Sequence, residues 1–343
     1  MKLPCSVLAF AFFSLMFSLI IQPAGFTLTE DNQNHEIEPE NLPVEFPKPW
    51  AFSFQLSNII QTGTLGEYVF NPTSFINSTL ESQLDWDVKP VLEINIHGRF
   101  QLPFGIFIQG SYGYFIPGRS GNMVDRDWIS PNPPLTQIND PTNPTHFSEH
   151  DNYLKEGYSG NIQVGLAATQ GPLGVDMSLG FKGKYYFFDG KGGYAYYPWG
   201  NVTFEDGGKV ISYGQVYRIP YLGFTIEGSP TPWLTLGING KVGAFVQVDA
   251  IDYHYLRNRL FFDTPRNGGY FAGGFQSAFH ITPNLFLTVQ LQGEFVPRFK
   301  GDTYIWTIEP REFLFGPFTN GAGASLRLIH LTWGIGYQGN LFP

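Results

Sequence analysis

The residues best suited to chemistry in this chain lie in two short acidic motifs, of which the first is an Asp-x-Asp pair. Asp125 and Asp127 are two residues apart within Gly121–Trp128. In an extended backbone, side chains at that spacing point to the same face, so the two carboxylates are expected to be neighbours. Like charges that close raise each other's proton affinity and titrate as a coupled pair. Because Asp-x-Asp is also common in solvated turns, this pair alone does not establish a site.

The second motif is Asp252-Tyr253-His254. A carboxylate beside an imidazole orients the ring and raises its basicity, so that the imidazole can take a proton from water. This motif therefore predicts a general base. The single cysteine, Cys5, precedes an N-terminal apolar run. The exported protein is expected to lack a cysteine, and with it a thiolate nucleophile.

The N-terminal composition predicts export and suggests the domain boundaries. An uncharged apolar run follows Lys2 and ends at small residues near Gly25. This is the layout of a secretory signal peptide and is too short for a membrane span, so 1–25 is expected to be removed. Residues 26–49 are acidic and rich in proline. They cannot bury a core and are expected to form a flexible leader before the folded domain, 50–343.

The remaining composition is unusual for a soluble secreted enzyme. Aromatic residues make up 17% of the chain and charged residues only 14%, and there are 40 glycines. No later segment has the roughly 18 consecutive apolar residues of a membrane helix. An exported chain of this kind is typical of a transmembrane β-barrel, with Trp50, Trp86 and Trp233 in its interfacial girdles. The net charge of −9 argues against nucleic acid as a partner and favours cationic ones.

A two-residue period in hydropathy from Trp50 onward predicts antiparallel strands. In 92–101, 173–182 and 287–295, apolar residues alternate with amides and charged residues. A soluble β-sandwich would show the same alternation, because it also buries one face of each strand. The signal peptide, the aromatic residues at strand ends and the strand length favour an all-β, antiparallel transmembrane barrel with a polar lumen.

Turn residues divide this pattern into about ten strands, an even number as in bacterial barrels. The expected strands are 50–67, 80–102, 104–116, 153–170, 173–188, 209–229, 233–249, 269–281, 285–299 and 322–338. Short turns alternate with four long loops, expected at 117–152, 189–208, 250–268 and 300–321. In this barrel class the short turns are periplasmic and the long loops extracellular.

Strand direction then gathers the acidic motifs at one extracellular mouth. The outward strand ends hold Glu67, Asp125, Asp127, Asp252 and His254. In the expected strand 233–249, the residues that face the lumen, such as Gln247 and Asp249, have odd numbers. Asp252 has an even number, so an unbroken alternation would turn it away from the lumen. A bulge or turn near Ala250 is therefore expected, and bulges are frequent beside active sites.

Six motifs follow one another in an order found in a known family and span nearly the whole expected barrel. They are Ser82-Gln83-Leu84-Asp85-Trp86, Gly121–Trp128, Arg218–Gly223, Asp252-Tyr253-His254, Thr282-Pro283-Asn284 and Asn320-Gly321-Ala322-Gly323. The chain resembles the omptin family, the outer-membrane endoproteases of Gram-negative bacteria. The Asn-Met-Val-Asp-x-Asp-Trp piece is the most specific part of this resemblance.

The resemblance implies a monomeric, ten-stranded barrel whose acidic cleft above the membrane cuts peptides or proteins, preferably between basic residues. In the family, an Asp–His dyad and a facing pair of aspartates hold a nucleophilic water. Carried across by position, His254 is the base and Asp252 orients it. Asp125 and Asp127 position the water and the substrate carbonyl. This chemistry needs no metal and no covalent intermediate.

Substrate binding is where the chain departs from the family. The family's pocket for a basic residue uses a glutamate on the first strand, which Glu67 matches. Its second acid lies two residues before the dyad aspartate, where this chain has Ala250. The adjacent Asp249 is expected to bind substrate only if the bulge turns it inward. A retained but relaxed preference for basic residues is therefore predicted.

Lipid binding also departs from the family, whose members bind lipopolysaccharide through Tyr, Glu and two Arg positions. The aligned positions in this chain hold Phe181, Gly183, Tyr185 and Val216. Lys182, Lys184 and Arg218 stand close by and offer a different lipid contact. Lipopolysaccharide is thus the one accessory expected for activity, with a weaker or altered dependence on it.

Two other functions are compatible with the same scaffold. One is a non-proteolytic adhesin, or a barrel that binds lipopolysaccharide or another ligand, and the other is a small gated pore. Intact Asp125, Asp127, Asp252 and His254 favour the protease, because a protein that only binds has no need of all four.

Overall fold

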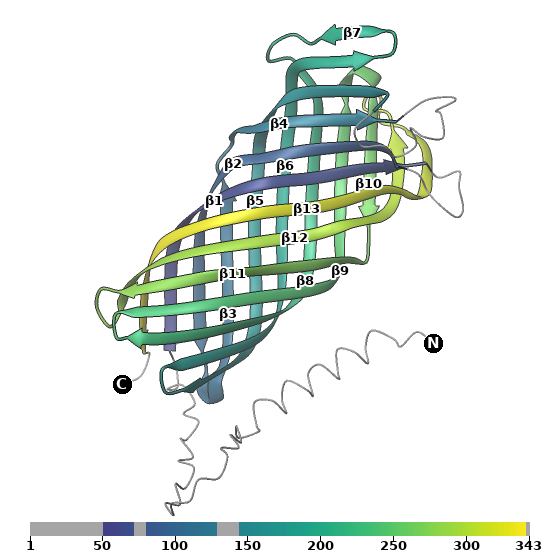
Figure 1. Cartoon of the computed structure of the whole chain (residues 1–343). Coiled ribbons are helices and arrows are strands. Elements are labelled where there is room, and N and C mark those ends of the chain that lie inside the picture. The colour runs from purple at the N-terminus through teal and green to yellow at the C-terminus, as the bar shows by residue number, and fades with distance from the viewer. Residues whose placement is uncertain (1–50, 72–79, 129–143, 341–343) are drawn as a thin grey trace, which may run out of the picture. The chain divides into compact units, whose positions relative to one another are not determined.

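The computed structural model describes residues 51–71, 80–128 and 144–340, which form one antiparallel sheet closed into a barrel (Figure 1). Two short 3-10 turns, η1 (Pro103–Gly105) and η2 (Tyr255–Arg257), accompany the strands. The strands are β1 (Ala51–Phe70), β2 (Leu80–Gln101), β3 (Ile106–Phe115), β4 (Gly118–Asp127), β5 (His146–Gln170), β6 (Leu173–Tyr197), β7 (Gly200–Thr203), β8 (Lys209–Thr231), β9 (Leu234–His254), β10 (Arg259–Pro265), β11 (Gly268–His280), β12 (Leu285–Trp306) and β13 (Phe313–Asn340). The expected signal peptide and leader lie outside the described residues.

Ten strand positions form the closed ring. β3 and β4 both pair with β2 and β5, so they are two halves of one interrupted strand. β10 and β11 pair in the same way with β9 and β12, and β7 adds a short strand beside β6 alone. The ring closes through the β1–β13 and β5–β6 ladders. The prediction of an antiparallel barrel of about ten strands is confirmed.

A belt of exposed apolar side chains surrounds the half of the barrel that carries the short turns. It includes Leu56, Ile94, Ile96, Ile162, Val164, Phe224, Leu236, Ile238, Leu291, Leu331 and Ile335. Water would disfavour so much exposed apolar surface, whereas lipid covers it without cost. The belt therefore marks the membrane-spanning part. No helix among the described residues is long and apolar enough to cross a membrane.

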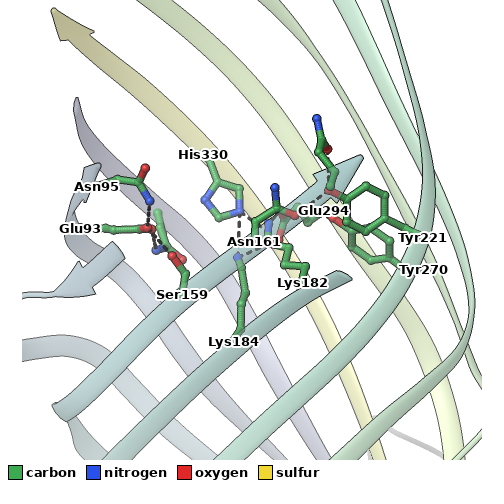
Figure 2. A network of polar contacts seen from close by, with 12 residues as sticks. Glu93, Asn95, Ser159, Asn161, Lys182, Lys184, Tyr221, Tyr270, Glu294 and His330 are labelled. Carbon is green, nitrogen blue, oxygen red and sulfur yellow. Dashed lines mark hydrogen bonds and ion pairs between the residues drawn. The ribbon is translucent and has the colours of Figure 1, made fainter. Parts of the chain in front are cut away.

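A network of polar side chains lies in the lumen (Figure 2). Glu294 is buried there and forms ion pairs with Lys182 and, at 2.7 Å, with Lys184. Gln61 donates a hydrogen bond of 2.6 Å to Glu93 in the same region. A cavity of ≈ 840 Å³ lies in the lumen toward the short turns. Lys182 and Lys184 thus face the lumen, and the prediction that they offer an outward lipid contact is wrong.

Above the belt, a layer of fully buried aromatic side chains fills the barrel. This aromatic layer consists of Trp86, Tyr186, Phe188, Tyr213 and Tyr217. Trp86 stacks on Tyr213 with ring centroids 5.2 Å apart, and Tyr186 donates a 2.7 Å hydrogen bond to Gln61 below. The interpretation of Trp86 as an interfacial residue is wrong, because its indole packs inside the barrel.

The strands continue well beyond the belt, into segments expected to be loops. β4 ends at Asp127 and β9 ends at His254, whereas loops were expected over 117–152 and 250–268. β6, β12 and β13 likewise extend into the other two expected loops. Above the membrane the outer face of a strand meets water and no longer lipid, so the alternation in hydropathy fades although the hydrogen-bonded ladders persist. The four predicted loops were therefore too long.

The expected bulge in β9 exists, but it lies before Ala250. Arg218 of β8 pairs with Gln247, whereas Leu222 pairs with Val242, so β9 carries one extra residue there. Within this bulge Phe245 has a φ of 62°. Pro220 of β8 lies opposite, and because proline has no N–H it cannot donate a hydrogen bond to the ladder. Beyond the bulge the even-numbered residues of β9 face the interior.

Candidate active site

One wall of the site is built on β1, β2 and β4. In these ladders Glu67 pairs with Leu84, and Leu84 pairs with Asp125, so the three side chains form an inward-facing row. Asp127 follows two residues later on the same face and is buried. Ser82 donates a 3.2 Å hydrogen bond to Asp125 Oδ1. The Asp-x-Asp motif therefore belongs to a strand, where its two carboxylates lie side by side, and not to a turn.

The opposite wall is the end of β9, where Asp252 and His254 lie on the inner face. His254 Nε2 and Asp252 Oδ2 are 2.5 Å apart, a hydrogen bond that fixes the plane of the imidazole. The edge of the ring meets Phe261 of β10, with centroids 5.2 Å apart. Asp252 is 2% exposed, and its Oδ1 is buried without a hydrogen-bond partner among the described residues.

Electrostatic coupling shows that the two walls enclose one space. Burial raises the pKa of Glu67 well above its usual range, and the charges of Asp252, Asp263 and Asp125 raise it further. Desolvation, followed by the charge of Asp127, raises the pKa of Asp125 well above its usual range. Charges of carboxylates raise each other's pKa in this way only where the groups lie close together in a poorly solvated region. The structure thus brings Glu67 together with both acidic motifs.

Asp249 does not join this group. It follows the bulge on an odd-numbered position of β9 and points to the outer face of the barrel. There it forms ion pairs with Arg218 and, at 2.5 Å, with Arg266. Ala250, the next residue, faces the interior and is buried. The bulge therefore turns Ala250 into the site and Asp249 away from it.

A carboxylate that sequence reasoning missed is Asp263 on β10. It is 5% exposed and pairs directly with Ala250 across the β9–β10 ladder. Burial raises its pKa to about 7, and the charge of Asp252 contributes in the same direction. The segment 250–268 was expected to be a loop, and residues of a loop cannot be assigned to the inner or outer face of the barrel. The two-residue spacing of Phe261, Asp263 and Pro265 was the available signal.

The floor of the site is the aromatic layer. Trp86 Nε1 donates a 3.3 Å hydrogen bond to Glu67 Oε2, so the indole both supports and orients this carboxylate. Water is scarce beside such a floor, which strengthens charge interactions in the site. Among the described residues no group of three or more His, Cys, Asp or Glu side chains is arranged to hold a metal ion.

The buried carboxyls predict how stability changes with pH. A carboxyl with a raised folded-state pKa contributes stability that is fully present below the unfolded pKa, about 3.9 for Asp. This contribution is lost as the pH rises through the folded value, about 7 for Asp263. We therefore expect Asp263→Asn to raise the thermal unfolding midpoint in detergent by several degrees at pH 8 and to change it little at pH 4.

Asp249→Asn is the matched control for this prediction. It removes a carboxylate that already has two arginine partners, so it is not expected to raise the midpoint at either pH. A lower midpoint for Asp263→Asn at pH 8 would contradict the prediction, because it would mean that the buried carboxylate stabilises the free protein.

Comparisons with known proteins identify the family of this chain. The omptin family model matches residues 49–338. Outer membrane protease OmpP of Escherichia coli is 26% identical over 262 residues, which cover 74% of this chain and 81% of that protein. Outer membrane protease IcsP of Shigella flexneri is 22% identical over 274 residues, covering 78% and 83%.

A solved structure resembles the same barrel. The crystal structure of outer membrane protease OmpT from Escherichia coli superposes with a TM-score of 0.74 at 22% identity. The match covers 88% of this chain and 99% of the OmpT chain, which supports the transmembrane barrel fold. Because the family model spans nearly the whole folded domain, this chain belongs to the omptin family and is an outer-membrane endopeptidase.

Proposed function

We propose that this endopeptidase cleaves peptide bonds with a water molecule that His254 deprotonates, at the extracellular mouth of the barrel. The observation that best supports the proposal is the meeting of two pairs in one space. Asp252 and His254 are hydrogen-bonded on one wall, and Asp125 and Asp127 lie on the other. A base, its orienting carboxylate and a facing carboxylate pair are the parts that a non-covalent hydrolysis needs.

In the proposed reaction the water oxygen attacks the substrate carbonyl carbon while its proton passes to His254. Asp252 holds the imidazole in place and stabilises the imidazolium that forms. The same proton then passes to the leaving amine as the C–N bond breaks. Burial, followed by the charge of Asp127, raises the pKa of Asp125, which favours its protonated form. That proton can form a hydrogen bond to the carbonyl oxygen, where negative charge develops.

The charge of the site supports a cationic substrate. Glu67, Asp125, Asp252 and Asp263 surround one space, and the whole chain carries a net charge of −9. Complementary charge steers cationic peptides to such a cleft and holds them there. Peptides or proteins with basic residues beside the cut bond are therefore the proposed substrates, bound by a monomer.

Lipopolysaccharide is the remaining proposed partner, and its contacts are expected to be weak. Arg218 points outward, but it is already paired with Asp249. The other two cations near the aligned lipid positions, Lys182 and Lys184, face the lumen. Adding lipopolysaccharide to protein refolded in detergent is therefore expected to raise kcat/KM for a dibasic peptide only modestly. A complete absence of activity without lipopolysaccharide would contradict this expectation.

The proposal is tested with a quenched fluorescent dibasic peptide added to intact cells that express the protein. Cleavage outside the cells is expected, because the end of the barrel that holds the candidate site is proposed to face the exterior. Tight peptide binding without cleavage would instead indicate an adhesin or binding barrel. The aromatic layer and the Glu294 network lie across the lumen and block a continuous channel, which argues against a pore.

A further inference from the structure

The pairing of Ala250 with Asp263 suggests an unassigned specificity residue. These residues are direct partners in the β9–β10 ladder, and both side chains face the interior. Side chains directly opposite in an antiparallel pair have Cβ atoms about 4.5–5.5 Å apart. Because Ala250 ends at its Cβ, it places no further side-chain atoms beside Asp263. A carboxylate is thus present beside Ala250, supplied by the neighbouring strand.

The charge environment of Asp263 differs from that of other carboxylates in the barrel. Buried Glu294 is ion-paired with two lysines, and Asp249 is ion-paired with two arginines. Among the ion pairs of residues 51–71, 80–128 and 144–340, none joins a lysine or arginine to Asp263 or Glu67. Buried carboxylates without a cation are costly, so a cationic ligand would be held strongly between them.

A second observation points to a ligand in the same space. Asp252 Oδ1 is buried and has no hydrogen-bond partner among the described residues, while Oδ2 is occupied by His254. The charge of Asp252 raises the pKa of both Glu67 and Asp263, so Asp252 lies close to both of these carboxylates. Buried polar atoms are rarely left without partners, and an N–H donor of a substrate would satisfy this one.

We propose that Asp263 and Glu67 together form the pocket for a basic substrate side chain beside the cut bond. This inference rests on the proposed endopeptidase function. Asp263 supplies, from the neighbouring strand β10, the second acid that is missing at Ala250 of β9. The preference for a basic residue is then strict, and not relaxed as the sequence alone predicts.

The test compares two peptides that differ only at the residue before the cut, arginine in one and citrulline in the other. Citrulline keeps the shape of arginine but carries no charge. We expect Asp263→Asn to reduce the ratio of kcat/KM for the arginine peptide to that for the citrulline peptide by about 10–100-fold. Asp249→Asn, an outward-facing carboxylate one residue from Ala250, is the matched control and is expected to leave the ratio unchanged.

A double variant, Ala250→Asp with Asp263→Ala, moves the carboxylate across the ladder and is expected to restore most of the ratio. Asp263→Glu, which keeps the charge, covers the case in which Asp263→Asn does not fold. If Asp263→Asn lowers kcat/KM equally for both peptides, Asp263 is not a specificity residue and the inference is overturned while the endopeptidase function stands.

Binding separates a failure of the inference from a failure of the function. The arginine peptide is titrated into His254→Ala protein and into the same protein with Asp263→Asn added. We expect the second change to weaken binding at least tenfold, about 1.4 kcal/mol. Equal binding to both proteins overturns the inference. Weaker binding, together with a wild-type protein that cleaves neither peptide, keeps the cation pocket and overturns the endopeptidase function.

Discussion

His254→Ala is expected to lower kcat by about 10²–10⁴-fold while the barrel stays folded, because a positioned general base contributes that much to a hydrolytic step. The imidazole is the one base held against a buried carboxylate in the site, through its 2.5 Å contact with Asp252. Its removal leaves substrate contacts in place, so KM is expected to change much less than kcat. The measurement is steady-state cleavage of a dibasic peptide by refolded protein.

Asp252→Asn is the companion variant for this prediction. An amide can still contact the ring, but it cannot stabilise the imidazolium, so kcat is expected to fall in this variant as well. Folding is checked by the shift in gel mobility on boiling and by a β-type circular dichroism spectrum. Full activity in folded His254→Ala would contradict the mechanism without affecting the barrel.

Asp125→Asn and Asp127→Asn are each expected to lower kcat by about 10²-fold, because misplacing the reacting groups by a small distance costs that much. The two carboxylates lie side by side on β4 and are proposed to act as one unit that positions the water. The double variant is therefore expected to be little worse than the poorer single variant, since the losses in such a unit do not add.

Asp85→Asn is the matched control for the carboxylate pair. Asp85 lies on β2 beside Leu84 and forms a 2.8 Å ion pair with Arg126, on the opposite face of the sheet from Asp125. Its loss is expected to leave kcat nearly unchanged, as surface ion pairs contribute little. A fully additive loss in the double variant of Asp125 and Asp127 would indicate two independent roles and would contradict their action as one unit.

The membrane-spanning part of the fold could be predicted because lipid outside and polar groups inside impose a strict period of two. Ile94 and Ile96 face lipid, while Glu93 and Asn95 face the lumen. Above the belt that contrast disappears, so the extensions of β4, β9 and β10 were expected to be loops. The backbone hydrogen bonds of these extensions continue, but they leave no alternation of apolar and polar residues in the sequence.

Single positions in the site were harder to predict, because the face of a residue depends on register. One extra residue opposite Pro220 reverses the parity of β9, which brings Asp252 into the site and turns Asp249 out. The predicted bulge had the right consequence for Asp252 but the wrong position. Asp263 was missed because its segment was expected to be a loop, and because its pairing with Ala250 is a contact between two strands.

The most direct measurement uses a peptide library and mass spectrometry, with refolded wild-type protein and the double variant His254→Ala with Asp125→Asn. Wild-type protein is expected to cut at a restricted set of peptide bonds beside basic residues. The double variant, folded by the same criteria, is expected to cut none of them at a comparable rate. Undiminished cleavage by the double variant, or no cleavage by the folded wild-type protein, would contradict hydrolysis by the Asp252–His254 and Asp125–Asp127 pairs.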